Sequence, residues 1–406
     1  MAGYDFLKTV TVLEVAQLGM DALGGHLADM GARVIKVEAL PGGDPVRFTG
    51  EHALGGPDGV GLLHLRWNRG KQSLGLDLKT PQGQALFRDL ASRADVVIEG
   101  LKGGALERLG LGYEVLRQRR PALVFCAISG LGRTGPYHAL RSHAVAYDAY
   151  AGLVPADVDS PPPAAHAFRP PSIGMQAPGL FAAVGVLAAL LRAHTTGEGA
   201  QIEVAAVDAA AHWVPDGVDA AANPDVCQAR AGFLDETGRM RHWPRLAQYV
   251  TRGGEVLLLE AFARPTWEKF CHLVGRADLL ELDRLGLDDA TYHARLRQEI
   301  AAILIQRTRA EWMAAFIAAD ISAMPVNDPA ALARDPHYLA RGNWYEVDLP
   351  DVGPVRLNGT PIRLAGATFA PAPAPGLGEH GPAILGEVLG LADGEIAALR
   401  ACGVVG

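Results

Sequence analysis

Residues 9–38, "TVTVLEVAQLGMDALGGHLADMGARVIKVE", form the stretch that decides the fold. Its two ends, "TVTVLEVA" and "RVIKVE", are rich in β-branched residues, which is typical of strands. The segment between them, "LGGHLADMGA", has the apolar spacing of an amphipathic helix that ends near Gly31. A strand, a helix and a second strand predict a βαβ unit, and therefore a parallel sheet with helices packed over it.

The same alternation continues after this unit. The runs "QSLGLDL", "ADVVIEG" and "PALVFCAIS" indicate further strands, and Thr80 and Pro81 indicate the N-cap and first residue of a helix. "GALERLGLGYEVLRQRR" is expected to be mostly helical, residues 180–191 to form an apolar helix, and "QIEVA" to form a short strand. We therefore predict an α/β fold, with residues 1–205 as the first part of a large domain.

A smaller domain is expected over residues 225–325, where the composition changes. "LAQYVTRGGEVLLLEAF" predicts a hairpin with Gly253 and Gly254 at its turn. The segments "RPTWEKFCHLVG", "ATYHARLRQEIAAILIQ" and "RAEWMAAFIAAD" follow it and predict helices, which gives an α+β domain. The tail then has proline- and glycine-rich connections and a closing helix, "DGEIAALRACG". Residues 159–172, "DSPPPAAHAFRPPS", predict a proline-rich loop.

Composition excludes several classes of protein. The formal net charge of −8 argues against a nucleic-acid partner, which needs a basic face. The 4 cysteines show no C-x-x-C spacing, so we expect reduced thiols, no metal site and a cytoplasmic protein. The N-terminus lacks the pattern of a signal peptide, and the most apolar run, residues 180–191, is too short to span a membrane.

Several charged residues near predicted loops are candidates for ligand binding. Glu38 ends the second strand of the βαβ unit, where dinucleotide-binding proteins place a ribose-binding acid, but the first turn is not G-x-G-x-x-G. The stretch "NRGKQSLGLDLKTPQG" carries Asn68, Arg69, Lys71 and Lys79 next to a strand and a helix start, which favours phosphate about as much as a solvated turn. Three further cations, which together suit a ligand with several phosphates, are Lys102, Arg108 and Arg141.

No hydrolase triad stands out in the sequence. Ser129 lies in "CAISGLGRTG", which is not the G-x-S-x-G pattern of a nucleophile elbow. His143, in "LRSHAVAYDAYAGL", precedes an apolar run and on its own reads equally well as a surface or packing residue.

A set of motifs in chain order resembles the family III CoA-transferases, the group that includes formyl-CoA transferase, carnitine CoA-transferase and α-methylacyl-CoA racemase. The motifs are "LADMGARVIKVE", "GGDPVR", "NRGKQSLGLDLKTPQG", "LERLGLGYE", "SGLGRTGPY", "HTTGEGAQIEV" and "GEHGPAILGEVLGLADGEIAALRACGVV". The resemblance implies a Rossmann-like large domain that residues 326–406 return to and complete. It also implies an interlocked dimer and CoA or acyl-CoA as substrate.

The resemblance also implies where CoA binds. Gly19 and Met20 fall where the first βα turn meets the thioester, and Leu40 stands where many members have a phosphate-binding arginine. The residues implied to lie against the adenine and phosphates are Leu76, Asp77, Leu78, Lys79, Gly100, Leu101, Lys102, Arg108, Arg141, Ser142, His143 and Ala144.

One residue departs from the family pattern. In the transferases an aspartate attacks the thioester carbonyl, and it lies four residues before the Gly-Leu of the apolar helix; that position here is Met175. A thioether is neither nucleophile nor base. His143 matches the histidine of the racemases, but the residue after it, an aspartate in racemases, is Ala144. Two-base racemisation therefore lacks its second base as well.

Three functions stay open on this resemblance. The chain is either one subunit of a CoA-transferase whose paralogous partner supplies the aspartate, or a stand-alone acyl-CoA isomerase, racemase-like enzyme or lyase that uses His143 as acid and base. The third function is acyl-CoA binding without catalysis. All three predict a CoA site, and they differ in whether the isolated chain is active.

Overall fold

The computed structural model describes residues 4–51, 53, 59–154, 172–213, 215–227, 243–282, 285, 288–350 and 352–406. The chain divides into two compact units, one of Met1–Asp219 with Asn343–Gly406 and one of Ala220–Gly342. The proline-rich loop predicted over residues 159–172 lies outside the described residues except for Ser172.

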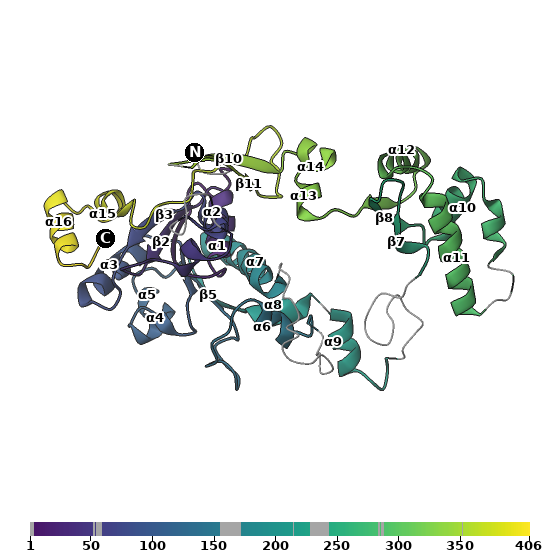
Figure 1. The fold of residues 1–406 in the computed structure, drawn as a ribbon. Helices are drawn as coiled ribbons and strands as arrows, with labels where there is room; N and C mark the ends of the chain where they lie inside the picture. The colour runs from purple at the N-terminus through teal and green to yellow at the C-terminus, as the bar shows by residue number, and fades with distance from the viewer. Residues whose placement is uncertain are drawn as a thin grey trace, which may run out of the picture. The chain divides into compact units, whose positions relative to one another are not determined.

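A six-stranded parallel sheet forms the centre of the first unit (Figure 1). Its strands are β1 (Thr11–Ala16), β2 (Arg33–Glu38), β3 (Gln72–Gly75), β4 (Val96–Gly100), β5 (Val124–Ser129) and β6 (Ala200–Ala205). They lie in the order β3-β2-β1-β4-β5-β6, and each neighbouring pair is parallel. This is the strand order of the Rossmann fold, so the predicted α/β class and Rossmann-like sheet are confirmed.

Helices cover both faces of the sheet, because alternate residues of each strand point to opposite sides. The helices of this unit, together with a short 3-10 helix, are α1 (Ala22–Asp29), η1 (Pro45–Phe48), α2 (Leu62–Asn68), α3 (Pro81–Ala91), α4 (Ala105–Arg108), α5 (Tyr113–Leu116), α6 (Val145–Tyr150), α7 (Ile173–Thr196), α8 (Ala206–His212), α15 (Gly381–Leu389) and α16 (Asp393–Ala401). α9 (Pro215–Ala222) crosses the boundary between the units. One core lies under α1, α7 and α8, and a second lies under α3, α4, α5, α15 and α16.

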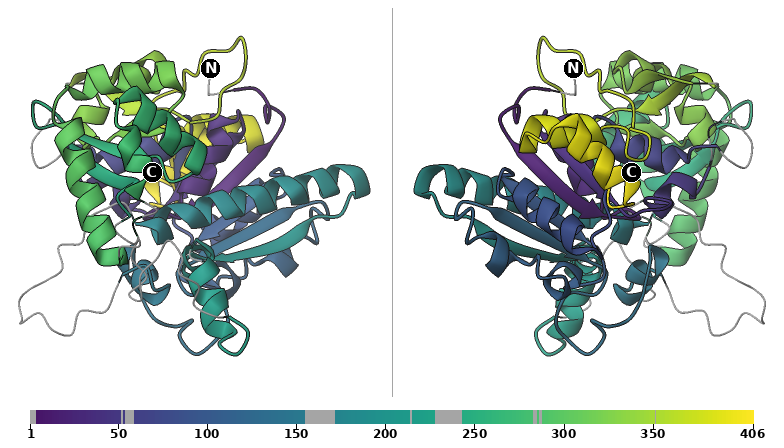
Figure 2. Two further views of the ribbon diagram at one scale, coloured as in Figure 1. Left: turned by 90° about the vertical axis from the view of Figure 1, so that its right-hand side faces the viewer. Right: turned by 90° about the vertical axis from the view of Figure 1, so that its left-hand side faces the viewer.

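The helix α7 is longer than the predicted segment, residues 180–191, and runs for 24 residues along the sheet (Figure 2). By length and composition alone it is apolar enough to cross a membrane. However, 50% of its most apolar window is buried, and it packs on β5, β6, α1 and α8. These contacts are those of a core helix in the first unit.

The second unit has its own sheet and core. The predicted hairpin is present as β7 (Leu246–Val250) and β8 (Val256–Glu260), with Gly253 and Gly254 at positive φ in its turn. The remaining elements are β9 (Ala323–Pro325), α10 (Arg264–Leu273), η3 (Ala277–Leu280), α11 (Asp289–Leu304), α12 (Arg309–Ala319), α13 (Pro329–Leu332) and α14 (Pro336–Ala340). Trp267, Phe270, Trp312 and Phe316 dominate the core between the helices and the sheet.

Two segments differ from the prediction. Residues 104–120, expected to be mostly helical, contain only the four-residue helices α4 and α5, because Gly104 and Gly110 take positive φ values of 71° and 68°. The tail contains an antiparallel hairpin that the sequence did not reveal, formed by β10 (Trp344–Leu349) and β11 (Gly353–Asn358).

Candidate functional site

A cleft of about 300 Å³ opens at the carboxyl ends of β1, β4 and β5. The strand order reverses between β1 and β4, and ligands of open α/β sheets bind at such a reversal. The turns after these strands supply residues 17, 18 and 20, residues 100–103 and residues 129–132, and the segment before α6 supplies residues 138, 140–143 and 147. The fold alone therefore places a ligand site here.

The cleft gathers about half of the residues predicted to bind CoA. Those that line it are Met20, Gly100, Leu101, Lys102, Arg141, Ser142 and His143. Gly19 lies in the same turn as Met20, Ala144 follows His143, and Arg108 donates to the carbonyl of Gly103 at 3.0 Å. Lys102, Arg141 and His143 are exposed, so their charged or polar ends are accessible to a ligand.

The predicted residues 76–79 do not line this cleft. They follow β3, which is separated from β1 by β2. Leu76 is buried and forms a bridge with Val405, whereas Lys79 is exposed beside the start of α3. CoA contacts at residues 76–79 therefore stay a prediction.

The polar residues 68–71 do not form a phosphate site. Arg69 is 6% exposed and pairs with Asp29, and Lys71 is 3% exposed and donates to Glu14 at 2.7 Å. Asn68 is fully buried as well. Residues 68–71 therefore form neither the phosphate site nor the solvated turn that the sequence left open, because their donors are used inside the fold.

Glu38 is also unavailable to a ligand. It is buried, accepts hydrogen bonds from Arg47 at 2.6 and 2.9 Å, and accepts another from Ser73 at 2.6 Å. Burial by itself would raise the pKa of Glu38, but Arg47 outweighs it and lowers that pKa to about 2. The interpretation of Glu38 as a ribose-binding acid is therefore wrong.

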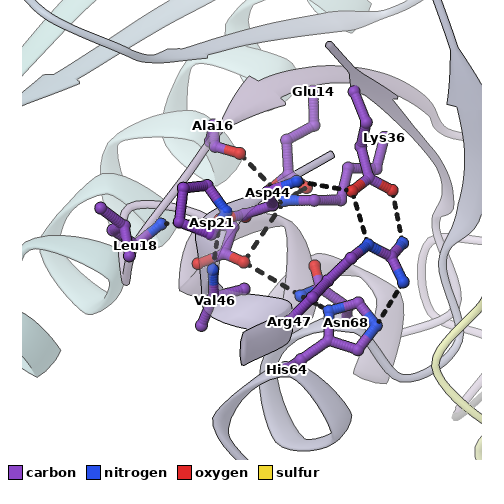
Figure 3. A network of polar contacts seen from close by, with 12 residues as sticks. Glu14, Ala16, Leu18, Asp21, Lys36, Asp44, Val46, Arg47, His64 and Asn68 are labelled. Atoms are coloured by element: carbon purple, nitrogen blue, oxygen red, sulfur yellow. Dashed lines mark hydrogen bonds and ion pairs between the residues drawn. The ribbon is translucent and has the colours of Figure 1, made fainter. Parts of the chain in front are cut away.

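A buried ion network lies next to the β1–α1 turn (Figure 3). Its charged members are Glu14, Asp21, Lys36, Asp44 and Lys71. Lys36 Nζ lies 2.8 Å from Asp44 Oδ2 and 3.3 Å from Asp21 Oδ2. Burial opposes ionisation of Asp21, but the charges of Lys36 and Lys71 outweigh it and lower its pKa to about 2. Burial raises the pKa of Glu14.

Met175 lies in the first turn of α7 and contacts the β1–α1 turn. It packs against the cluster formed by Ala22, Val46 and Trp67. A Cβ at Gly19 would lie only 2.9 Å from Met175 Cγ, so the close approach of the turn and α7 requires glycine. The position at which the family resemblance expects a carboxylate is apolar and lies beside the turn that lines the cleft.

The start of α7 is tied to the segment that carries His143. Ser172, the N-cap residue, makes no side-chain cap hydrogen bond, and Asp148 of α6 instead accepts from the Gly174 amide at 2.7 Å. In the same segment Tyr147 donates its hydroxyl to the carbonyl of Ser142 at 2.6 Å. These two bonds fix the cleft wall relative to Met175.

Sequence reasoning missed several cleft residues, among them Gln17, Ser129, Leu131 and His138. Ser129 has no nucleophile motif around it, yet it ends β5, is 6% exposed, and its hydroxyl has no hydrogen-bond partner among the described residues. The signal that finds such residues is their place at the carboxyl ends of parallel strands. Those residues that the structure describes contain no group of three or more His, Cys, Asp or Glu suited to a metal ion.

The fold and the cleft together define a Rossmann-type α/β protein with a ligand site at the strand reversal. Residues 7–381 match the family model described as CoA-transferase family III. The chain is 30% identical to the succinyl-CoA–D-citramalate CoA-transferase of Chloroflexus aurantiacus, with 98% of each protein covered. It is 29% identical to the beta subunit of the succinyl-CoA–L-malate CoA-transferase of that organism, with 93% of each covered.

Solved structures agree with these relatives. A CAIB/BAIF family protein from Brucella suis has a TM-score of 0.75 and 27% identity, covering 95% of this chain and 100% of that one. Rv3272 from M. tuberculosis has a TM-score of 0.77 and 28% identity, covering 94% and 99%. The chain belongs to CoA-transferase family III and is a CoA-transferase, and the substrates of that family are CoA and acyl-CoA.

Proposed function

We propose that this chain is a cytoplasmic CoA-transferase subunit that moves CoA between an acyl-CoA and a carboxylic acid, and that a paralogous partner supplies the nucleophilic carboxylate. The observation that carries the proposal is Met175, an apolar residue beside the turn that lines the cleft. The cleft retains cations at Lys102 and Arg141, so it keeps the charge that CoA phosphates require. In this proposal the chain still binds CoA, but it lacks the carboxylate that would form the covalent intermediate.

In this proposal the partner's carboxylate attacks the thioester carbonyl carbon, the C–S bond breaks, and CoA leaves as a thiolate. The thiolate then attacks the resulting anhydride at the enzyme's acyl carbon and releases the first acid, which leaves CoA as an enzyme thioester. The acceptor acid reverses these steps. The present chain would contribute CoA-binding surface and the cleft wall, and we propose that His143, which lines the cleft, contacts the bound ester.

Two observations support a partner. One relative is named as a beta subunit, which indicates that enzymes of this family work with more than one kind of chain. α7 also leaves large apolar side chains exposed on one side, namely Leu180, Val184, Leu187 and Leu191. We therefore propose an intertwined dimer, either with a second copy or with the paralogue.

A second candidate function rests on His143, which lines the cleft and is exposed. A thioester acidifies its α-carbon, so a single positioned imidazole is sufficient for α-proton removal near neutral pH. This would make the isolated chain an isomerase, a racemase-like enzyme or a lyase. The third function, acyl-CoA binding without catalysis, is the remaining outcome of the same test.

The deciding experiment uses the purified chain alone in deuterated water with succinyl-CoA or butyryl-CoA and free acid acceptors. The expected result is CoA binding without transfer or α-deuteration, and transfer after the paralogous chain is added. Deuterium at the α-carbon that disappears in His143→Ala would instead establish the single-base enzyme. Efficient transfer by the chain alone would contradict the role assigned to Met175.

A further inference from the structure

The β1–α1 turn holds a conformation that it would not adopt unaided. Leu18 has a φ of 51°, in the left-handed region that non-glycine residues avoid, and Gly19 follows with a φ of 93°. Gln17, Leu18 and Met20 of this turn form one wall of the cleft. Surrounding contacts must therefore fix the turn.

Lys36 holds the start of the turn. Its ammonium group donates to the carbonyl of Ala16 at 2.9 Å, and the same group bonds Asp44 and Asp21 (Figure 3). Lys36 and Asp21 are fully buried. Because water is excluded, this charge depends on its protein partners, and the carboxylates are held at the positions that the ammonium sets.

The two carboxylates that Lys36 binds also hold the turn itself. Asp21 accepts the amide of Gly19 on Oδ1 at 3.0 Å, and Asp44 accepts the amide of Leu18 on Oδ1 at 3.4 Å. The other oxygen of each carboxylate faces Lys36. The Lys36 ammonium group therefore binds the carbonyl that precedes the strained turn and acts, through the two carboxylates, on the amides of Leu18 and Gly19.

Buried charges of this kind are poor evidence for stability, since well-packed apolar residues usually do as well. A role in fixing geometry explains the cluster better. The opposite side of the turn is occupied by Met175, whose Cγ leaves no space for a side chain at Gly19. The turn is thus held between the ion network and α7, and any shift of it moves the cleft wall.

We propose that Asp21 and Lys36 are positioning residues, which hold the β1–α1 turn in the form that contacts the thioester half of a bound CoA ester. The proposal rests on the proposed function, because it assumes that the cleft binds CoA. It adds residues that touch no ligand themselves and that act through the backbone of the turn.

The main test is Asp21→Asn. Asp21 accepts hydrogen bonds on both oxygens, from Gly19 on one and from Lys36 and Asn68 on the other, so an amide must fail on one side. The matched control is Asp29→Asn, because Asp29 is equally buried and also accepts on both oxygens, from Arg69. Asp29 ends α1, at the opposite end of the helix from the turn, and its side chain pairs with Arg69.

Two readouts separate positioning from simple destabilisation. Calorimetry with CoA and with adenosine 3′,5′-bisphosphate compares the whole ligand with its nucleotide half, and amide hydrogen exchange follows residues 16–20. In Asp21→Asn we expect about tenfold weaker CoA binding, unchanged nucleotide binding and at least tenfold faster exchange at Gly19. Asp29→Asn should lower the thermal midpoint and leave these three values as in the unsubstituted protein.

Equal weakening of both ligands, unchanged CoA binding, or an unchanged Gly19 amide in Asp21→Asn would overturn the proposal. If the unsubstituted protein binds neither ligand, the proposed function fails, and the assignment to CoA fails with it, while the exchange data still decide whether Asp21 holds the turn. If Asp21→Asn does not fold, Asp44→Asn is measured in the same way, with the exchange expected to change at Leu18.

Discussion

Met175 is the residue on which the proposed function depends, because it stands where the family resemblance expects a carboxylate. Its neighbours Ala22, Val46 and Trp67 form an apolar cluster against which the half-buried thioether side chain packs. A carboxylate at this position would need either solvent or a donor to stay charged. The apolar surroundings of position 175 therefore suit a methionine side chain better than a carboxylate.

Met175→Asp is expected to lower the free energy of unfolding by about 1–3 kcal/mol, because it places a polar group in this apolar cluster. Met175→Leu keeps volume and polarity and should change it by less than about 1.5 kcal/mol. Urea unfolding measures the free energy of unfolding of both variants.

Met175→Asp also tests the missing nucleophile. If a carboxylate is the only missing group, intact mass spectrometry will detect CoA or an acyl group on this variant after incubation with succinyl-CoA. Covalent labelling of the unsubstituted chain would contradict this explanation.

Glu99, at the end of β4, should make stability depend on pH. It is 1% exposed, Oε1 accepts the Leu106 amide at 2.8 Å, and Oε2 has no partner among the described residues. Burial raises the pKa of Glu99 from 4.5 to about 6. The folded protein therefore keeps a proton that the unfolded chain loses, and stability falls by about 2 kcal/mol as the pH rises from 4.5 through 6.

Glu99→Gln removes this titration but keeps an acceptor for Leu106. Between pH 4.5 and pH 7 the free energy of unfolding of the variant should not show the fall that Glu99 causes in the unsubstituted protein. At pH 8 the variant should be the more stable of the two, as measured by urea unfolding at each pH. Identical pH profiles for the two proteins would show that Glu99 is not protonated in the folded state at pH 5.

At the scale of elements, the N-terminus of α7 is capped by Asp148, a side chain of α6. Asp148→Ala removes the acceptor of the Gly174 amide and should cost about 1–2 kcal/mol, with faster amide exchange over residues 173–176. Ser172→Ala is the control, because the Ser172 hydroxyl has no hydrogen-bond partner among the described residues, and its cost should stay within about 0.5 kcal/mol. An equal fall in the free energy of unfolding of the two variants would show that Asp148 does not cap α7.

The elements that sequence reasoning predicted are those with strong local signals. β1, β2, β4 and β5 are short segments that contain β-branched residues, and Thr80 caps α3 as predicted, accepting the Gly83 amide at 3.0 Å. The hairpin β10–β11 was missed because it lies among proline- and glycine-rich connections, although its strands alternate between more and less buried residues. Local signals thus located the first βαβ unit, the hairpin β7–β8 and the closing helix α16, but not the hairpin of the tail.

The site was predictable only in part, for a related reason. The family resemblance implied Met20, Gly100 and residues near them, and these line the cleft. Lys71 was expected either to bind phosphate or to lie in a solvated turn, and it is buried instead. Its partner Glu14 lies 57 residues away in the sequence, and no local pattern reveals that such a pair will meet in the core. Cations near loops therefore need the tertiary structure before they can be assigned to a ligand.

At the scale of the whole molecule, the exposed apolar side of α7 predicts association. Val184 is 69% exposed, so Val184→Glu should leave the stability of a single chain within about 0.5 kcal/mol of its original value. The same charge in an apolar interface would weaken a dimer at least tenfold, as measured by analytical ultracentrifugation. Val115→Glu, at an exposed position in α5, is the control and should not change assembly. A monomeric unsubstituted chain at all concentrations would contradict the intertwined dimer.

The tail residues complete a core that begins near the other end of the chain. Ile384 and Ile396 pack into the core beneath α3, and the Val404 carbonyl accepts the amide of Asp77 at 2.9 Å. During synthesis on a ribosome, the apolar side of β3 and α3 therefore stays exposed to solvent until the second unit has been translated and α15 and α16 follow it. We expect nascent chains stalled before α15 to recruit chaperones.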